Sequence, residues 1–109
     1  MKARKKLAVV IACLTTGTLA GANVLADEQA VQRGARLYAN NCSTCHGDDL
    51  QNNSTIAFDL RRLKSDEHSR FVNSVTNGKN AMPSWDGALA PAQIEDLWNY
   101  IRANAYAPD

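Results

Sequence analysis

The chain has 109 residues, with twelve Lys and Arg, eleven Asp and Glu, and a formal net charge of +1 at pH 7. This length allows one small domain and leaves no room for a second one. The charges are nearly balanced and form no basic stripe after residue 26, so nucleic-acid binding has no electrostatic support.

Residues 1–26 have the layout of a secretory signal peptide. Four Lys and Arg within the first six residues precede an apolar run from Leu7, and the segment ends in Val24-Leu25-Ala26. We expect cleavage after Ala26 and export to the periplasm. The remaining domain, residues 27–109, then carries eight Lys and Arg against eleven Asp and Glu, a formal net charge of −3.

Two alternatives to a cleaved signal peptide remain open. The segment could be retained as a membrane anchor, although Thr15 and Thr16 interrupt its apolar run short of the roughly 20 residues that span a bilayer. Cys13 could instead be a lipoprotein site, although the apolar segment between Lys6 and Cys13 is very short. We expect cleavage, and no stable membrane insertion afterwards.

The cysteines are the next constraint. A domain of about 80 residues buries little apolar surface by itself. Natural domains of this size commonly need a stabilising element in addition to their hydrophobic core. Because Cys13 leaves with the signal peptide, Cys42 and Cys45 are the remaining thiols. Exporting compartments are generally oxidising, so the two thiols should be bridged to each other, ligate a metal or be covalently occupied.

The hydrophobic pattern predicts an all-α domain with three main helices and long loops. The first helix begins near Asp27 and Glu28, whose charges favour a helix N-terminus, and runs to the cysteine pair. Its stripe consists of Ala30, Val31, Gly34, Leu37 and Tyr38. The second helix, of about a dozen residues, begins with an N-cap at Ser65 and stops at Asn77-Gly78.

The third predicted helix begins at Pro91, which suits a first helical turn, and Gln93 is placed to complete its cap. Its stripe consists of Ile94, Leu97, Trp98, Ile101 and Ala105. Residues 47–64 and 78–90 are rich in Asn, Asp, Gly, Ser and Pro, and they predict loops with at most one short helical turn. Loops of this length are uncommon in a compact small domain unless they wrap something.

Cys42, Cys45 and His46 form a C-x-x-C-H motif for which three chemistries compete. A structural zinc site needs about four ligands, and the domain adds only His68 as a further His or Cys. A thioredoxin-like dithiol needs a βαβ framework that the sequence does not show. The spacing matches covalent attachment of haem c, in which each thiol adds to one vinyl group and His46 is the proximal iron ligand. We therefore expect one covalent haem c, whose apolar disc supplies much of the missing core.

Met82 is the candidate for the other face of the iron. It is the only methionine after residue 26, and Pro83 restrains the backbone beside it. A single methionine is more often a flexible core filler, but its place in a stiffened loop favours iron ligation. His68 is the rival ligand, and an open sixth position is the remaining alternative.

Three segments together resemble a known family, the class I c-type cytochromes of the small bacterial kind. They are Cys42–Gly47, the Gly78-Lys79 pair before Met82-Pro83, and the stretch Leu97–Ile101, and the resemblance covers residues 28–105. It implies a cytochrome c fold in which the first helix packs nearly at right angles on the last helix, with the haem wedged among helices and loops. In that fold Gly34 and Tyr38 of the first helix meet Leu97 and Tyr100 of the last one.

The resemblance also implies a function. Iron ligated by both His46 and Met82 leaves no position for a substrate, so we expect a single-electron carrier and not an enzyme. Methionine ligation and burial of the haem both raise the reduction potential. The alternatives are a haem-based sensor or enzyme with an open sixth position, and a structural subunit of a larger complex.

The expected partners are redox proteins, and the carrier itself is expected to be a monomer. Residues 58–62, 71–72 and 82–85 resemble cytochromes that accept electrons from quinoprotein alcohol dehydrogenases, which suggests a dehydrogenase donor. A terminal oxidase or another cytochrome would be the acceptor. Arg61 and Arg62 are candidates for pairing with a haem propionate, or are solvated charges. Trp85 is a candidate wall of the haem site, and Lys79 a candidate docking charge at the haem edge.

Overall fold

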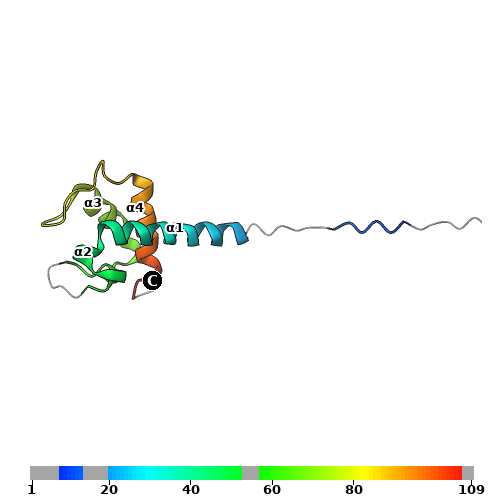
Figure 1. The fold of residues 1–109 in the computed structure, drawn as a ribbon, viewed down its shortest axis with the longest axis horizontal. Helices are drawn as coiled ribbons and strands as arrows, with labels where there is room; N and C mark the ends of the chain where they lie inside the picture. Colours follow the sequence, from blue (N-terminus) through cyan, green and yellow to red (C-terminus); the bar gives the residue numbers. More distant parts are fainter. Residues whose placement is uncertain (1–7, 14–19, 53–56, 107–109) are drawn as a thin grey trace, which may run out of the picture.

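The computed structural model describes residues 8–13, 20–52 and 57–106, so residues 1–7 and 14–19 of the expected signal peptide lie outside the described part. Regular structure in these ranges is helical, with two isolated β-bridges between Lys79 and Met82 and between Asp86 and Leu89. The predicted all-α class is therefore confirmed (Figure 1). Among the described helices, none combines the length and apolar character needed to cross a bilayer.

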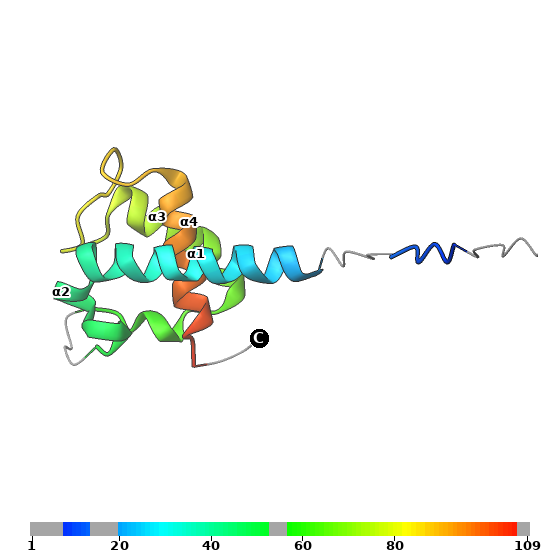
Figure 2. The same ribbon diagram turned by 45° about the vertical axis from the view of Figure 1, so that its right-hand side comes forward.

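The two longest helices, α1 (Ala20–Asn41) and α4 (Pro91–Ala103), pack on each other. Figures 1 and 2 show α4 running across α1 and not along it, as the resemblance implies. The backbones meet at Gly34, where an added Cβ would lie 2.0 Å from the carbonyl oxygen of Asp96. An ion pair between Arg33 Nε and Asp96 Oδ2, 2.9 Å apart, lies beside this crossing. Only glycine allows the two helices to come this close.

Helix α1 begins at Ala20 and not near Asp27, so the predicted N-terminus is wrong. Residues 20–26 contain no proline, and four of the seven are Ala or Leu, which favour a helix and outweigh the less favourable Gly21 and Asn23. At its other end, α1 continues almost directly into the short helix α2 (Ser43–His46). The junction is held by the Cys42 N–H, which donates to the Tyr38 carbonyl at 2.8 Å.

Helix α3 (His68–Asn77) follows a 3₁₀ turn, η3 (Ser65–Glu67). The sequence predicts Ser65 as the cap, but Lys64 occupies the N-cap position of η3, and its N–H donates to the Glu67 carboxylate at 2.9 Å. The Glu67 carboxylate thus caps the start of this turn. The predicted stop at Gly78 is confirmed, since its φ is +78° and its N–H donates to the Ser74 carbonyl.

Helix α4 begins as predicted, because Gln93 Oε1 accepts the Ala90 N–H at 2.8 Å. It ends at Ala103, so Ala105 of the predicted stripe lies beyond it. The Asn104 side chain donates to the Tyr100 carbonyl at 2.8 Å and so satisfies one of the last carbonyls of the helix.

The loops contain more local structure than the sequence predicts, namely the 3₁₀ turns η1 (Asp48–Leu50) and η2 (Leu60–Arg62). They close over one hydrophobic core drawn from α1, α3, α4 and the loops. Its buried members are Tyr38, Leu50, Leu63, Phe71, Val75, Leu89, Ile94, Leu97, Tyr100 and Ile101.

Gly34→Ala should lower the free energy of unfolding by about 1–3 kcal/mol, because the new methyl group collides with the α4 backbone. Thermal and denaturant unfolding of the cofactor-loaded protein would measure the loss. Gln32→Ala, an exposed change on the same helix, is the control and should shift stability by less than about 0.5 kcal/mol. Equal stability of the two variants would contradict the close helix crossing.

Candidate functional site

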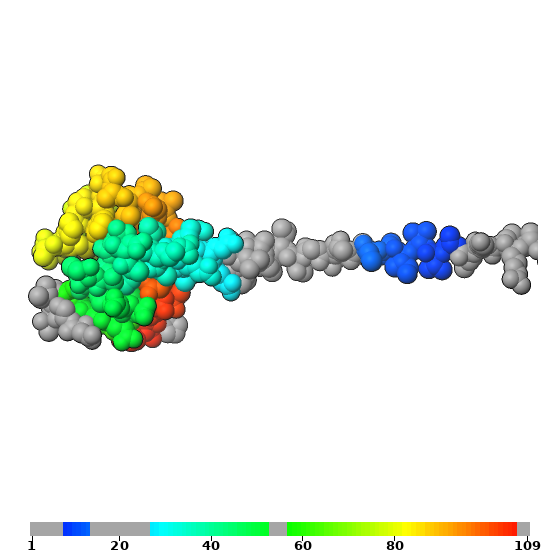
Figure 3. Space-filling model, viewed as in Figure 1, coloured from blue at the N-terminus to red at the C-terminus, as the bar shows by residue number. Residues whose placement is uncertain are grey.

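The predicted site residues Cys42, Cys45, His46 and Met82 all line one cavity of about 420 Å³. Figures 1 and 2 show α2 and the loop after α3, from which these residues come, at the same end of the molecule. In the space-filling view, the loop near residue 80 (yellow) lies above the end of α1 and the motif that follows it (Figure 3). The remaining lining is mainly apolar and includes Tyr38, Leu60, Leu63, Phe71, Val75, Trp85, Leu89, Leu97 and Ile101.

The two cysteines of the cavity wall are free thiols, with Cys42 half-buried and Cys45 exposed. Burial, followed by the neighbouring Cys45, raises the pKa of the Cys42 thiol to about 11, so this group is neutral at physiological pH. In the described ranges, no group of three or more His, Cys, Asp or Glu side chains is arranged to hold a metal ion.

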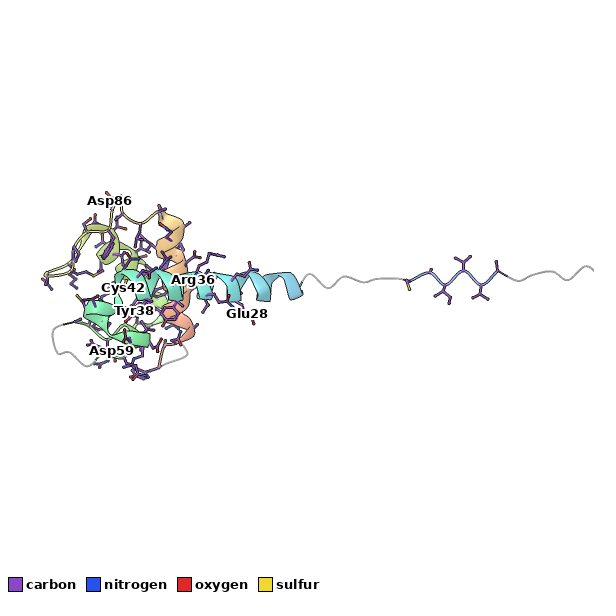
Figure 4. The ribbon with its side chains drawn as sticks, viewed as in Figure 1. Glu28, Arg36, Tyr38, Cys42, Asp59 and Asp86 are labelled. Atoms are coloured by element: carbon purple, nitrogen blue, oxygen red, sulfur yellow. The ribbon has the colours of Figure 1, made fainter. Side chains whose placement is uncertain are left out.

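Tyr38, in the last turns of α1, holds the residue that follows the C-x-x-C-H motif. Its hydroxyl donates to the Gly47 carbonyl, directly after the histidine, and burial raises the pKa of the phenol so that it stays protonated. Figure 4 shows Tyr38 and Cys42 close together at this end of α1. The helix that leads into Cys42 therefore also holds the residue after His46.

His46 is oriented by a main-chain group. Its Nδ1 lies 3.0 Å from the Phe58 carbonyl oxygen, which can only accept a hydrogen bond. This contact assigns the proton to Nδ1 and leaves the Nε2 lone pair available to a metal. Metal-bound histidines commonly have such a partner, which fixes the ring and increases its basicity.

Met82 lies at the end of a tight turn that begins at Lys79. The two residues exchange backbone hydrogen bonds, each 3.0 Å long. Asn80, inside the turn, has a φ of +54°, a conformation that asparagine tolerates better than most residues. The turn therefore fixes the backbone of Met82 without help from a regular strand.

The chain after Met82 is tied back to the last turn of α3. The Trp85 N–H donates to the Val75 carbonyl at 2.9 Å, and Ser84 Oγ donates to the Thr76 carbonyl at 2.5 Å. Gly78 makes this return possible, since an added Cβ would lie 2.8 Å from both the Met82 oxygen and the Ser84 nitrogen. Met82 is thus held from both sides.

Of the other residues that the sequence indicates, some line the cavity and some do not. Trp85 and Lys79 line the cavity, with Lys79 exposed, as expected for a wall and a surface charge. His68 does not line it, because its Nε2 lies 2.9 Å from the Glu95 carboxylate and its ring meets the edge of Trp98. The rival ligand therefore faces α4 and not the cavity.

Arg61 and Arg62 also lie away from the cavity lining. Arg61 is paired with Asp59 at 3.0 Å, and Arg62 is exposed. The cavity lining also includes Arg70, an exposed residue of α3 that the sequence analysis missed and that pairs with Glu67 at 2.7 Å. The Phe58 carbonyl was missed as well, because a main-chain acceptor leaves no signal in the sequence.

These residues fit a covalently attached iron porphyrin. The cavity is mainly apolar and within the usual size of a cofactor site, and two thiols on its wall can each add an S–H across one vinyl bond. His46 has one ring nitrogen engaged and the other available, as an iron ligand requires.

Comparison with known proteins agrees with this fit. Residues 29–101 match the family model described as cytochrome C oxidase, cbb3-type, subunit III. The chain belongs to the class I c-type cytochromes. This cytochrome therefore has one covalently bound haem c, and the family assigns it to the electron carriers.

Several curated proteins are similar to this cytochrome. Cytochrome c6 of Nostoc sp. is 40% identical over 78 residues, covering 68% of this chain and 70% of its own length. Cytochrome c6 of Limnospira maxima is 35% identical, covering 65% and 89%. Quinohemoprotein alcohol dehydrogenase ADH-IIG of Pseudomonas putida is 30% identical over 73% of this chain, which spans only 11% of that enzyme. No solved structure matches the cytochrome significantly.

Gly78→Ala should loosen the loop that carries Met82. Gly87→Ala is a matched control, because Gly87 also has a positive φ (+77°) but an added Cβ there meets nothing within 4 Å. Both variants introduce backbone strain, and only Gly78→Ala adds a collision, so it should be less stable by about a further 1–3 kcal/mol. The backbone amide of Trp85 should also exchange its hydrogen faster in Gly78→Ala than in Gly87→Ala. Equal stability and exchange in both variants would contradict the packing described for this loop.

Proposed function

We propose that the haem of this electron carrier is bound through thioethers to Cys42 and Cys45, with its iron held between His46 and Met82. The observation that carries the proposal is that all four side chains line one apolar cavity. The His46 tautomer supports it further, because Nδ1 is engaged and Nε2 is left for iron. Met82 is the methionine that lines this cavity, and its loop is held at both ends by backbone hydrogen bonds.

This ligand pair explains electron transfer without substrate chemistry. With His46 and Met82 as its two protein ligands, the iron would have no position open to a substrate. The thioether of Met82 is a soft neutral donor that favours the reduced state. The apolar lining acts in the same direction, since the oxidised centre carries the extra charge that a poorly solvating environment disfavours.

Residues 1–26 are proposed to be a signal peptide cleaved after Ala26, with the cytochrome domain, residues 27–109, working as a monomer in the periplasm. The support is the basic start, the short apolar run and the Ala-terminated end of this segment. N-terminal sequencing of the mature protein is the direct test, and Asp27 is the expected first residue.

The proposed donor is a periplasmic quinoprotein alcohol dehydrogenase, and the proposed acceptor is a terminal oxidase or another cytochrome. The similarity to a quinohemoprotein alcohol dehydrogenase supports the first, and the oxidase-subunit description of the family model supports the second. Exposed Lys79 at the cavity would attract an acidic partner surface.

Met82→Ala is the experiment that tests the ligand set. It should lower the midpoint potential by on the order of 0.1 V, a modest part of the range that axial ligands control. It should also allow added imidazole or cyanide to bind the iron. Asn80→Gly, in the same turn but compatible with a positive φ, should keep the original spectrum. An unchanged spectrum in Met82→Ala would exclude Met82 as the ligand, and strong ligand binding by the unmodified protein would favour the sensor alternative.

Electron transfer from a purified quinoprotein alcohol dehydrogenase should depend on salt, because exposed charges guide a transient encounter. At low ionic strength Lys79→Ala should slow the reaction severalfold, and the difference should vanish at high salt. Lys64→Ala, which removes an exposed lysine away from the cavity lining, is the control. Stopped-flow reduction measures both rates. No electron transfer at any salt concentration would refute this donor.

A further inference from the structure

The carbonyl that orients His46 is part of a rigid unit. Phe58 C=O, which lies 3.0 Å from His46 Nδ1, shares one planar peptide group with the nitrogen and Cα of Asp59. Any rotation of the backbone at Asp59 therefore moves the acceptor oxygen relative to the imidazole. The position of Asp59 thus matters to His46 although the two side chains belong to different segments.

Asp59 is held by three hydrogen bonds from a single residue. Its Oδ1 accepts the Arg61 backbone N–H at 3.0 Å and the Arg61 Nε–H at 3.0 Å, and its Oδ2 accepts from Nη2 at 3.1 Å. The paired side chains are about four-fifths buried, with exposed fractions of 23% and 19%. The guanidinium lowers the pKa of Asp59, so the pair stays ionised at neutral pH. A bidentate pair of this kind has a well-defined geometry.

The C-terminal segment supports Arg61 from outside. The guanidinium carbon lies 4.5 Å from the centre of the Tyr106 ring, and the Tyr106 N–H donates to the Arg61 carbonyl at 2.9 Å. One turn earlier, Arg102 Nη1 donates to the Leu63 carbonyl at 2.6 Å. The chain after α4 is thereby tied to the loop that carries Phe58.

We propose that Asp59, Arg61 and Tyr106 form a brace that positions the Phe58 carbonyl on His46 and so sets the reduction potential of the haem. The inference rests on the proposed function, because it takes His46 as the iron ligand. A firm Nδ1–H···O contact makes the imidazole a stronger donor, which stabilises the oxidised iron. A loosened brace weakens the contact and raises the potential.

The brace acts together with a contact on the other side of Phe58. The Asn52 side chain donates to the Ala57 carbonyl, one residue before Phe58. The phenylalanine ring itself lies 5.1 Å below the Arg70 guanidinium. Loss of the brace should therefore loosen the His46 contact without releasing the whole segment, so the haem should stay bound. Asp59, Arg61 and Tyr106 are positioning residues that reach the iron only through Phe58 and His46.

Two matched pairs of variants test the brace in the haem-loaded protein. Arg61→Gln breaks the bidentate pair, and Arg62→Gln removes an equal charge from the exposed neighbouring residue. Tyr106→Leu removes the aromatic face without changing charge, and Tyr106→Phe keeps that face. The measurements are the midpoint potential and, by NMR of the reduced protein, hydrogen exchange of the haem-bound His46 Nδ1–H.

Arg61→Gln should have a higher potential than Arg62→Gln and roughly tenfold faster exchange of the His46 proton, as expected for the loss of about one hydrogen bond. Tyr106→Leu should change in the same direction by less, and Tyr106→Phe should match the unmodified protein. Equal potentials and exchange rates within each pair would overturn the brace while leaving His46 as ligand. Absence of any iron-bound His46 signal in the unmodified protein would overturn the proposed ligand set, and the brace with it.

Discussion

An apolar cavity of about 420 Å³ is lined by much of the hydrophobic core of this small cytochrome, and the rest of the structure depends on filling it. Apolar side chains that line such a cavity are unfavourably exposed to water unless something covers them. A covalently bound haem c would cover this lining with its own apolar faces. The cofactor would then be part of the core as well as the redox centre.

Two close backbone contacts, at Gly34 and Gly78, hold the polypeptide around the cavity. Neither contact leaves room for a side chain at the glycine. The crossing of α1 and α4 at Gly34 brings Tyr38 and the cysteine motif to one side of the cavity. The return of the chain at Gly78 brings the Met82 loop to the same cavity. Neither glycine is itself a candidate ligand, yet the two help to determine where the candidate ligands lie.

Much of this arrangement could be predicted because its signals are local. The C-x-x-C-H spacing, the stop at Gly78 and the cap at Ala90 each depend on a few adjacent residues, and the structure agrees with the last two. The resemblance implies the crossing of α1 and α4, but other contacts between distant segments could not be predicted. The pairing of His68 with Glu95 and the Phe58 carbonyl at His46 depend on how the loops fold over the core. The cap before α3 lies at Lys64, the N-cap of η3, and not at Ser65, because the Glu67 carboxylate accepts the Lys64 N–H.

The central claim is that His46 and Met82 occupy both axial positions of the iron, which makes this cytochrome a carrier of electrons and closes it to substrates. X-ray absorption at the iron edge of the purified protein tests this claim most directly. The account predicts one sulfur neighbour beside the four porphyrin nitrogens and one histidine nitrogen. A coordination shell of nitrogen alone, or one with an open or water-filled sixth position, would contradict it.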